Sequence, residues 1–340
     1  MMQAIKKYAV LKGIVDQCDD VVRAALERNA VREANIAMES FNNGGKRLRP
    51  ALLVLSSMLP GGEKLGKADD ALIDLAGAVE LVHLATLFHD DVIDEVDHRR
   101  TKLSARLKYG NYASVLTGDF ALAEALDLVQ RSGHPEAMPE FIRTLRVLVR
   151  GESIETSNKY NYDLTEAQYY DIISEKSASL FALSCKVGAL TRGPEFADPL
   201  GHFGWGLGMA FQMIDDLDDM LDSPQQSYDC DLRNGYIALP LIRVFSALQD
   251  GHRDRLIDVI EKAEFGDENE RYIVGLCMEY GTIHQTAQEI HSHLDRARGA
   301  LDRFERGDAW RLLTHVVDDL KAYADNQIDN YEDFLRKSTA

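Results

Sequence analysis

The chain has 340 residues, enough for one large domain or two small ones with a substantial buried core. Its formal net charge of −18 at pH 7 repels nucleic acid and anionic membrane surfaces, so neither is expected as a partner. Anionic substrates would be repelled as well, unless a local basic cluster or divalent cations reverse the sign of their site.

The N-terminal segment lacks the features of a secretory signal, because Lys12 interrupts its apolar residues and acidic residues soon follow. The four cysteines are far apart and form no CxxC motif; they are Cys18, Cys185, Cys230 and Cys277. This pattern fits buried thiols in a reducing compartment better than disulfides or zinc ligands. We therefore expect a cytoplasmic protein.

The first motif in the chain is the basic stretch GGKRLRP at residues 44–50. Its glycine pair permits close backbone approach, and Pro50 suits the first turn of a helix, whose N-terminus favours anions. Lys46, Arg47 and Arg49 supply positive charge beside that turn. The stretch favours a phosphate site, and the alternative is a basic loop that offsets acidic residues nearby.

The following segments favour helices. Residues 61–134 and 241–340 contain no proline, and apolar residues recur at spacings of three and four over residues 72–86. Strand-like alternation is scarce, so we predict a nearly all-α chain and treat residues 1–340 as a single domain. The longest uncharged stretch, 199–214, is shorter than the roughly 20 residues of a membrane span, and no transmembrane helix is expected.

Three aspartates follow the apolar run of the first long helix. Asp90, Asp91 and Asp94 form a DDxxD pattern, and on a helix they share one patch. Like charges so close cost a helix roughly 0.2–0.5 kcal/mol per pair, and a bound cation removes that cost. Oxygen ligands without an encircling loop favour magnesium. The alternative is a solvated acidic face, but the apolar run before Asp90 favours a cavity.

Further candidates for binding phosphate flank this motif. His83 lies two turns before Asp90 on the same face. A lone histidine is more often a core residue, but in company with Lys46, Arg49 and Arg100 a neutral imidazole that donates to phosphate is the better interpretation. Arg99 and Arg100 follow the motif, and each can bind phosphate oxygens with two hydrogen bonds.

A second acidic cluster lies further along the chain. Asp215, Asp216 and Asp219 repeat the DDxxD spacing after another apolar run, and Gln212 precedes Asp216 by one turn. Two inward-facing clusters of this kind can hold one diphosphate through several magnesium ions. Between the clusters, the stretch EKSASLF at residues 175–181 adds two polar candidates, Lys176 and Ser177.

Taken together, these motifs resemble the trans-type polyprenyl diphosphate synthases, and among them the long-chain, octaprenyl-like members. The resemblance covers most of the chain, and the joint occurrence of the motifs in this order makes it specific. It rests on GGKRLRP at 44–50, ELVHLATLFHDDVID at 80–94, RR at 99–100, GD at 118–119, GE at 151–152, EKSASLF at 175–181, FQMIDD at 211–216 and DLRNGYIALPL at 231–241.

The resemblance implies an all-α, isoprenoid-synthase-type bundle of long helices around a deep central cavity, usually in a homodimer. It implies several Mg²⁺ ions per site, held by Asp90, Asp91, Asp94, Asp215, Asp216 and Asp219. It assigns isopentenyl diphosphate to Lys46, Arg49, His83 and Arg100. It assigns the allylic diphosphate to Arg99, Lys176, Ser177 and Gln212, with Arg99 and Lys176 also counted among the catalytic residues.

The reaction implied by the resemblance is ionisation of an allylic diphosphate, attack by the isopentenyl double bond and loss of a proton. Magnesium acts as a Lewis acid on the leaving group. Ala85 and Thr86, five and four residues before Asp90, are small where the family uses bulky residues to stop chain growth. They therefore suggest a long linear product, which is expected to be delivered to a membrane.

The sequence departs from the family pattern at one loop, and it leaves two alternative functions open. Residues 220–232 contain neither Lys nor Arg, although the family usually places a diphosphate-binding lysine in this loop. A class I terpene cyclase shares the fold and the first aspartate motif, but it needs only one diphosphate site. A non-catalytic subunit of a heteromeric prenyl synthase commonly loses aspartates from one motif, and both motifs are intact here.

Overall fold

The computed structural model describes residues 9–62, 65–99, 102–221, 231–248, 250–263 and 265–336. The first half of the chain forms α2 (Ala9–Glu27), α3 (Arg32–Asn42), α4 (Leu48–Met58), the 3₁₀ turn η1 (Leu59–Gly61), α5 (Asp70–Ile93), β1 (His98–Arg99), β2 (Lys102–Leu103), α6 (Ala105–Tyr109), α7 (Asn111–Arg131) and α8 (Ala137–Ser157). The second half forms α9 (Glu166–Ile173), the π turn η2 (Ser174–Ala178), α10 (Ser179–Leu190), the 3₁₀ turn η3 (Pro194–Phe196), α11 (Ala197–Leu221), α12 (Leu239–Ala247), α13 (Asp250–Glu261), α14 (Asp267–Glu279), α15 (Thr282–Ala300) and α16 (Asp308–Arg336).

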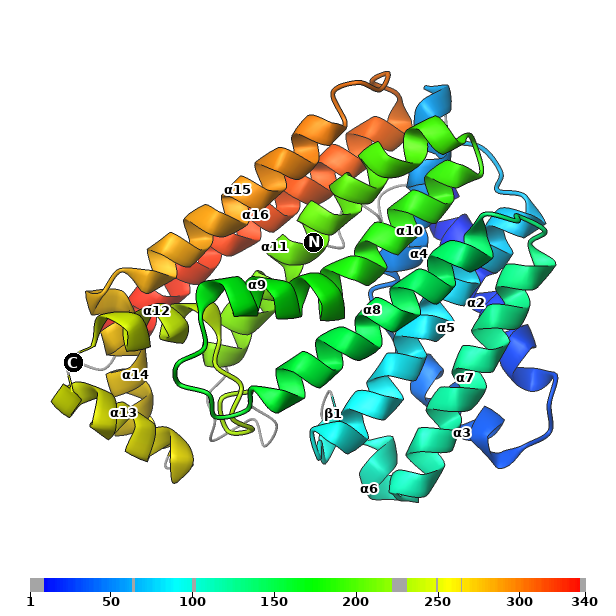
Figure 1. The fold of residues 1–340 in the computed structure, drawn as a ribbon. Coiled ribbons are helices and arrows are strands. Elements are labelled where there is room, and N and C mark those ends of the chain that lie inside the picture. The colour runs from blue at the N-terminus through cyan, green and yellow to red at the C-terminus, as the bar shows by residue number, and fades with distance from the viewer. Residues whose placement is uncertain are drawn as a thin grey trace.

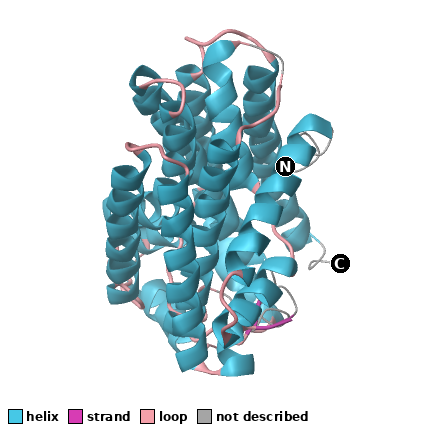
Figure 2. Ribbon diagram, turned by 90° about the vertical axis from the view of Figure 1, so that its right-hand side faces the viewer, coloured by secondary structure: helices cyan, strands magenta, loops and turns pink. Residues whose placement is uncertain are grey.

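The all-α prediction is confirmed. The one β element among the described residues is a two-residue antiparallel pair, β1 with β2, in which His98 faces Leu103. Figures 1 and 2 show long helices running roughly side by side, with the connecting loops gathered at their ends. Buried apolar side chains from α2 to α16 form one continuous cluster.

Helix α5 is central to this arrangement. It begins where the Asp69 side chain accepts a hydrogen bond from the backbone N–H of Leu72 at 2.8 Å, a standard N-cap. It packs against α2, α4, α7 and α10. By length and composition α5 could span a membrane, but 78% of its apolar window is buried inside the fold. Its apolar surface is thus used by neighbouring helices of the same chain.

A second packed layer positions the other side of the candidate site. Helix α11 lies between α10 and α15, and α15 packs along α16; these pairs are seen in Figure 1 as green beside orange and red ribbons. Both DDxxD motifs lie at the C-terminal ends of their helices, on α5 and α11. The packing of the two helices therefore brings two acidic helix ends toward one region.

Candidate active site

A cavity of about 1410 Å³ opens between these helix ends. It is lined from the loop before α4 and from α5, α8, α9, η2, α10, α11 and the segment before α12. Twelve of the residues singled out in the sequence line it: Lys46, Arg49, His83, Thr86, Asp90, Asp91, Asp94, Lys176, Ser177, Gln212, Asp215 and Asp216. Residues predicted from separate motifs therefore meet around one space.

The first acidic cluster occupies the last turn of α5. Asp91 is buried, with 4% of its surface exposed, and Asp94 caps the helix through its backbone N–H, which donates to the Asp90 carbonyl at 2.8 Å. The Asp94 carboxylate accepts a hydrogen bond from the Tyr236 hydroxyl and lies 3.2 Å from the ammonium of Lys159. The end of α5 is thus tied to two later segments of the chain.

The second acidic cluster is organised by a chain of hydrogen bonds. Asp216 is buried, and its carboxylate accepts from the Tyr169 hydroxyl and, at 2.8 Å, from the Gln212 amide. The Gln212 carbonyl in turn accepts from the Ser177 hydroxyl. Burial raises the pKa of Asp216 to about 7, against the effect of these donors, and the charge of Asp215 adds to the rise.

The acidic clusters are suited to divalent cations. Helix C-termini carry partial negative charge, so carboxylates at the ends of α5 and α11 stand where cations are favoured. Within the described part of the chain, no three His, Cys, Asp or Glu side chains converge on a ready-made metal cage. Magnesium is usually held in this way, by one or two carboxylates with the remaining positions filled by water and substrate phosphate. The donor set therefore fits magnesium.

The basic stretch GGKRLRP forms the turn into α4. Gly44 has a φ of +95°, which favours glycine, and a Cβ on Gly45 would lie 2.5 Å from the guanidinium of Arg47. Arg47 itself adopts the left-handed conformation, with φ of 49°, at the N-cap of α4. The glycine pair predicted to permit close approach thus makes room for a neighbouring arginine.

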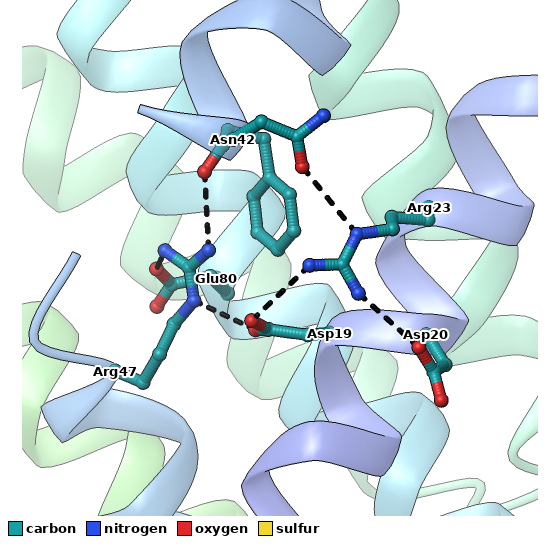
Figure 3. Close-up of polar contacts among 7 residues, drawn as sticks. Asp19, Asp20, Arg23, Asn42, Arg47 and Glu80 are labelled. Atoms are coloured by element: carbon teal, nitrogen blue, oxygen red, sulfur yellow. Dashed lines mark hydrogen bonds and ion pairs between the residues drawn. The ribbon is translucent and has the colours of Figure 1, made fainter. Parts of the chain in front are cut away.

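Arg47 is held by contacts from three helices (Figure 3). Its guanidinium donates to Asp19 at 2.7 Å, to Glu80 at 2.9 Å and to the Phe41 carbonyl at 3.2 Å, and its Cζ lies 3.9 Å from the Phe41 ring centre. Arg23 shares the Asp19 carboxylate at 3.7 Å. This network fixes the conformation of the turn, so Arg47 positions the two neighbouring cations, Lys46 and Arg49.

Those cations, Lys46 and Arg49, lie against aromatic rings of the cavity. The Lys46 ammonium is 5.6 Å from the Phe211 ring centre, and the Arg49 Cζ is 4.6 Å from that of Phe181. Burial lowers the pKa of Arg49 to about 10, so its guanidinium stays charged at neutral pH. Its Nε is buried with no hydrogen-bond partner among the described residues, which leaves a donor available to an anion.

A π turn brings the next pair of polar residues into the cavity. In η2 the Ser174 hydroxyl accepts from the Trp205 indole at 2.8 Å, and the extra residue of the turn rotates Lys176 and Ser177 toward the site. Lys176 is ion-paired with Glu155 and, at 3.2 Å, with Glu152. Burial favours its neutral form, but the carboxylates of Glu155, Asp90 and Glu152 outweigh it and raise the pKa of Lys176 well above its ordinary value.

Four predicted residues have a different status. Ala85 is 3% exposed and packs in the core rather than in the cavity wall, because on a helix it points about 100° away from Thr86. Asp219 is not part of the wall; its carboxylate accepts the backbone N–H of Asp231 at 2.8 Å. Arg100 lies outside the described residues, as does the side chain of Arg99.

Sequence reasoning missed two residues that line the cavity, Asp231 and Tyr236, and one beside it, Lys159. Asp231 lines the cavity, and its enclosure there, with the carboxylates of Asp219 and Asp216 nearby, raises its pKa well above the ordinary value. Tyr236 and Lys159 both contact Asp94. Asp231 and Tyr236 belong to the quoted stretch DLRNGYIALPL, which offered a signal, whereas nothing in the motif pattern pointed to Lys159.

Comparison with known proteins gives consistent relatives. The model of the polyprenyl synthetase family matches residues 32–276. Octaprenyl diphosphate synthase of Escherichia coli is 33% identical over 269 residues, covering 76% of this chain and 80% of that protein. Component 2 of the heptaprenyl diphosphate synthase of Geobacillus stearothermophilus is 31% identical, covering 91% and 96%. A Caulobacter crescentus polyprenyl synthase, crystallised with calcium and isoprenyl diphosphate, superposes with a TM-score of 0.85 at 28% identity, covering 95% and 98%.

Proposed function

Because the chain belongs to the polyprenyl synthetase family, we infer that the cavity between α5 and α11 is the active site of a trans-prenyltransferase. The enzyme is a polyprenyl diphosphate synthase, which joins isopentenyl diphosphate to an allylic diphosphate and so lengthens a linear chain. One observation carries the assignment of the site: residues of both acidic clusters line the same large cavity as Lys46 and Arg49 and, separately, Lys176. Two diphosphates need carboxylates that hold metal ions and cations that bind the phosphate oxygens directly.

We propose the following division of roles. The six motif aspartates hold magnesium, with Asp219 acting through the mouth segment around Asp231. Lys46, Arg49 and His83, together with Arg100, bind isopentenyl diphosphate; the buried free donor of Arg49 supports this. Lys176, Ser177 and Gln212, together with Arg99, bind the allylic diphosphate. Hydrogen bonds that link Ser177 to Gln212 and Gln212 to Asp216 support this, as does the effect of the Asp90 charge on the pKa of Lys176.

In the reaction, bound magnesium would supply Lewis-acid stabilisation to the departing diphosphate. The protein side chains position the two diphosphates so that the isopentenyl double bond faces the ionising carbon. Leu180, Phe181 and Phe211 form part of an apolar wall that keeps water from the allylic cation. The proton lost at the end has an acceptor in the released diphosphate, so no protein base is required.

We further propose a long product, as in the octaprenyl-like members. The cavity volume of about 1410 Å³ and the small Thr86 in its wall support a long chain. Cytosolic localisation is proposed as well, on the support of Cys18, Cys185 and Cys277, which are free and buried. For each of the three thiols, burial raises the pKa to about 12, so they are inert.

The working unit is proposed to be a homodimer. Exposed apolar side chains outside the cavity occur on α7 and α8, where Tyr112 is 79%, Val115 40% and Ile142 42% exposed. Large exposed apolar side chains of this kind are typical of contact surfaces. The Geobacillus relative is named as one component of a synthase, so a heteromeric assembly is the competing arrangement.

The two alternative functions are not favoured. A terpene cyclase has no use for a second cation group of the kind formed by Lys46 and Arg49. A non-catalytic subunit would not retain both acidic clusters facing one cavity. The family and its relatives support chain elongation instead.

The test is a product assay on the purified chain alone. It is incubated with magnesium, labelled isopentenyl diphosphate and, separately, allylic primers of two, three and four isoprene units, and the dephosphorylated products are separated by chromatography. A ladder ending at one long linear alcohol is expected. EDTA should abolish it, and Asp90→Asn should lower the rate by at least about a hundredfold.

The matched control is Asp302→Asn, which neutralises an exposed carboxylate in the turn after α15 and should leave the ladder unchanged. Cyclic hydrocarbons formed without isopentenyl diphosphate would instead identify a cyclase. No product from any primer would contradict the proposed function and favour a subunit that needs a partner.

A further inference from the structure

The loop between α8 and α9 docks onto the segment that precedes α12; in Figure 1 the two lie side by side as green and yellow-green traces. Tyr160 adopts a left-handed conformation, with φ of 58°, and its backbone N–H donates to the Gly235 carbonyl at 2.8 Å. Its hydroxyl donates to the Arg233 carbonyl at 3.2 Å. A Cβ on Gly235 would lie 2.6 Å from the Tyr160 ring, so the loop fits only against a glycine.

This docking brings Lys159 to the edge of the cavity, where it contacts the lining residue Asp94. Its ammonium lies 3.2 Å from the Asp94 carboxylate and 4.7 Å from the ring centre of Tyr236, whose hydroxyl also bonds Asp94. The ammonium of Lys176 lies 5.7 Å from the same ring centre. The Tyr236 ring therefore makes cation–π contacts with two ammonium groups from different elements, beside the first acidic cluster.

The charges around the first acidic cluster leave room for a second cation beside Lys176, which is assigned to the same diphosphate. Lys176 is already paired with Glu152 and Glu155, both on α8. The loop at 222–230 contains no lysine or arginine in its sequence. A diphosphate held near Asp90 and Asp94 would thus gain from a further cation in addition to Lys176, and Lys159 lies at Asp94.

We propose that Lys159, seated on Tyr236, binds the diphosphate of the allylic substrate and exchanges its ion pair with Asp94 for the phosphate oxygens. The proposal rests on the proposed function. An ammonium on a flexible stem has three donors and can keep one contact while it gains another. The position selects the allylic group, because the cations assigned to isopentenyl diphosphate lie against Phe181 and Phe211 instead.

The test compares Lys159→Gln with Lys321→Gln. The two lysines are matched, since their side chains are 23% and 22% exposed and each is paired with an aspartate, Asp94 and Asp295 respectively. Initial rates are measured against each substrate in turn. Lys159→Gln should raise the KM for the allylic diphosphate about tenfold or more and leave that for isopentenyl diphosphate unchanged, whereas Lys321→Gln should change neither.

A binding readout separates this role from a merely structural one. Calorimetric titration with inorganic diphosphate in the presence of EDTA should show weaker binding to Lys159→Gln than to the unmodified protein. Lys159→Arg should recover part of the affinity, because it restores the charge. Tyr236→Leu removes the aromatic ring that contacts Lys159, so it should also raise the KM for the allylic diphosphate.

Two results would overturn the proposal while leaving the enzyme assignment intact. One is an unchanged allylic KM in an active Lys159→Gln protein; the other is an equal rise for both substrates together with a lower melting temperature, as a purely structural pair would give. An unmodified chain that is inactive with every primer would instead overturn the proposed function itself.

Discussion

At the scale of the residue, Arg47 shows how a buried cation can serve a site that it does not enter. Its side chain is 12% exposed and that of its partner Glu80 is 9% exposed, so neither can be compensated by water if the other is removed. Burial raises the pKa of Glu80 against the opposing effect of Arg47 and Arg49. The Arg47–Glu80 pair therefore stabilises the turn into α4, but each residue depends on the other to remain buried in its charged form.

We predict that Arg47→Met lowers the free energy of unfolding by about 3 kcal/mol, because it leaves the Glu80 carboxyl buried without its partner. Denaturant titration measures the change. The control is Arg23→Met, which contacts the same Asp19 carboxylate but is 40% exposed, so its cost should stay below about 1 kcal/mol. Equal costs for the two variants would show that burial of the ion pair does not matter.

The second prediction at this scale concerns product length. Thr86→Phe places a bulky ring in the cavity wall and should shorten the longest product. Ala85→Phe instead places the ring in the core, where it should cost roughly 1–3 kcal/mol of stability. Chromatography of the products and thermal melts of both variants distinguish the two positions. Shortening by Ala85→Phe alone would mean that the growing chain passes behind α5.

At the scale of the element, the packing of α15 on α11 encloses a histidine. His293 is 4% exposed, and its ring centre lies 5.4 Å from that of Trp205 and 6.5 Å from that of Tyr170. Burial lowers the pKa of His293, and Arg296 lowers it further, whereas Glu289 opposes them. The neutral imidazole is thus the form that fits between the helices.

We therefore predict that stability falls as the pH drops below about 6.5, the ordinary pKa of histidine. The unfolded chain takes up a proton there while folded His293 does not, so the contribution is complete above that pH and is lost below it. Melting temperatures of the unmodified protein and of His293→Gln between pH 8 and pH 5.5 measure this difference. Parallel curves for the two proteins would contradict the assignment.

Elements differ in how far the sequence predicts them. The helices that carry the two DDxxD motifs were predictable, since apolar spacing and motif spacing agree over α5 and α11. The π turn η2 and the β1–β2 pair were not, because neither has a periodic pattern. Lys159 was missed for another reason: its position depends on the contact between Tyr236 and Asp94, which are 142 residues apart in sequence.

At the scale of the whole molecule, an acidic chain gathers some of its cations around one cavity. The chain carries 56 acidic and 38 basic residues, yet cations from the loop before α4 and from η2 line the cavity, and Lys159 of the α8–α9 loop contacts the lining residue Asp94. The lining still holds more carboxylates than Lys and Arg side chains, so an anionic substrate requires bound divalent cations as well. Exposed apolar side chains on α7 and α8 that do not line the cavity are Tyr112, Val115 and Ile142.

We predict that Tyr112→Glu converts the proposed homodimer to a monomer, because it places a charge in the proposed contact surface. Size-exclusion chromatography with light scattering gives the mass of each form. Tyr280→Glu, which alters an exposed aromatic residue at the end of α14, should leave the mass unchanged. A monomeric unmodified chain at micromolar concentration would exclude the homodimer.

Helix α5 also has a consequence for how the chain is made. Its apolar sequence is complete at Ile93, but its partner α10 begins only at Ser179. At a synthesis rate of roughly 5–20 residues per second, α5 waits on the order of ten seconds for that partner. During this interval α2 and α4 are already made and α7 is completed, but the part of α5 that packs on α10 still lacks its neighbour, although the helix has the hydropathy of a membrane span. The helix on which the cavity is built is thus a segment of the nascent chain that needs shielding from aggregation.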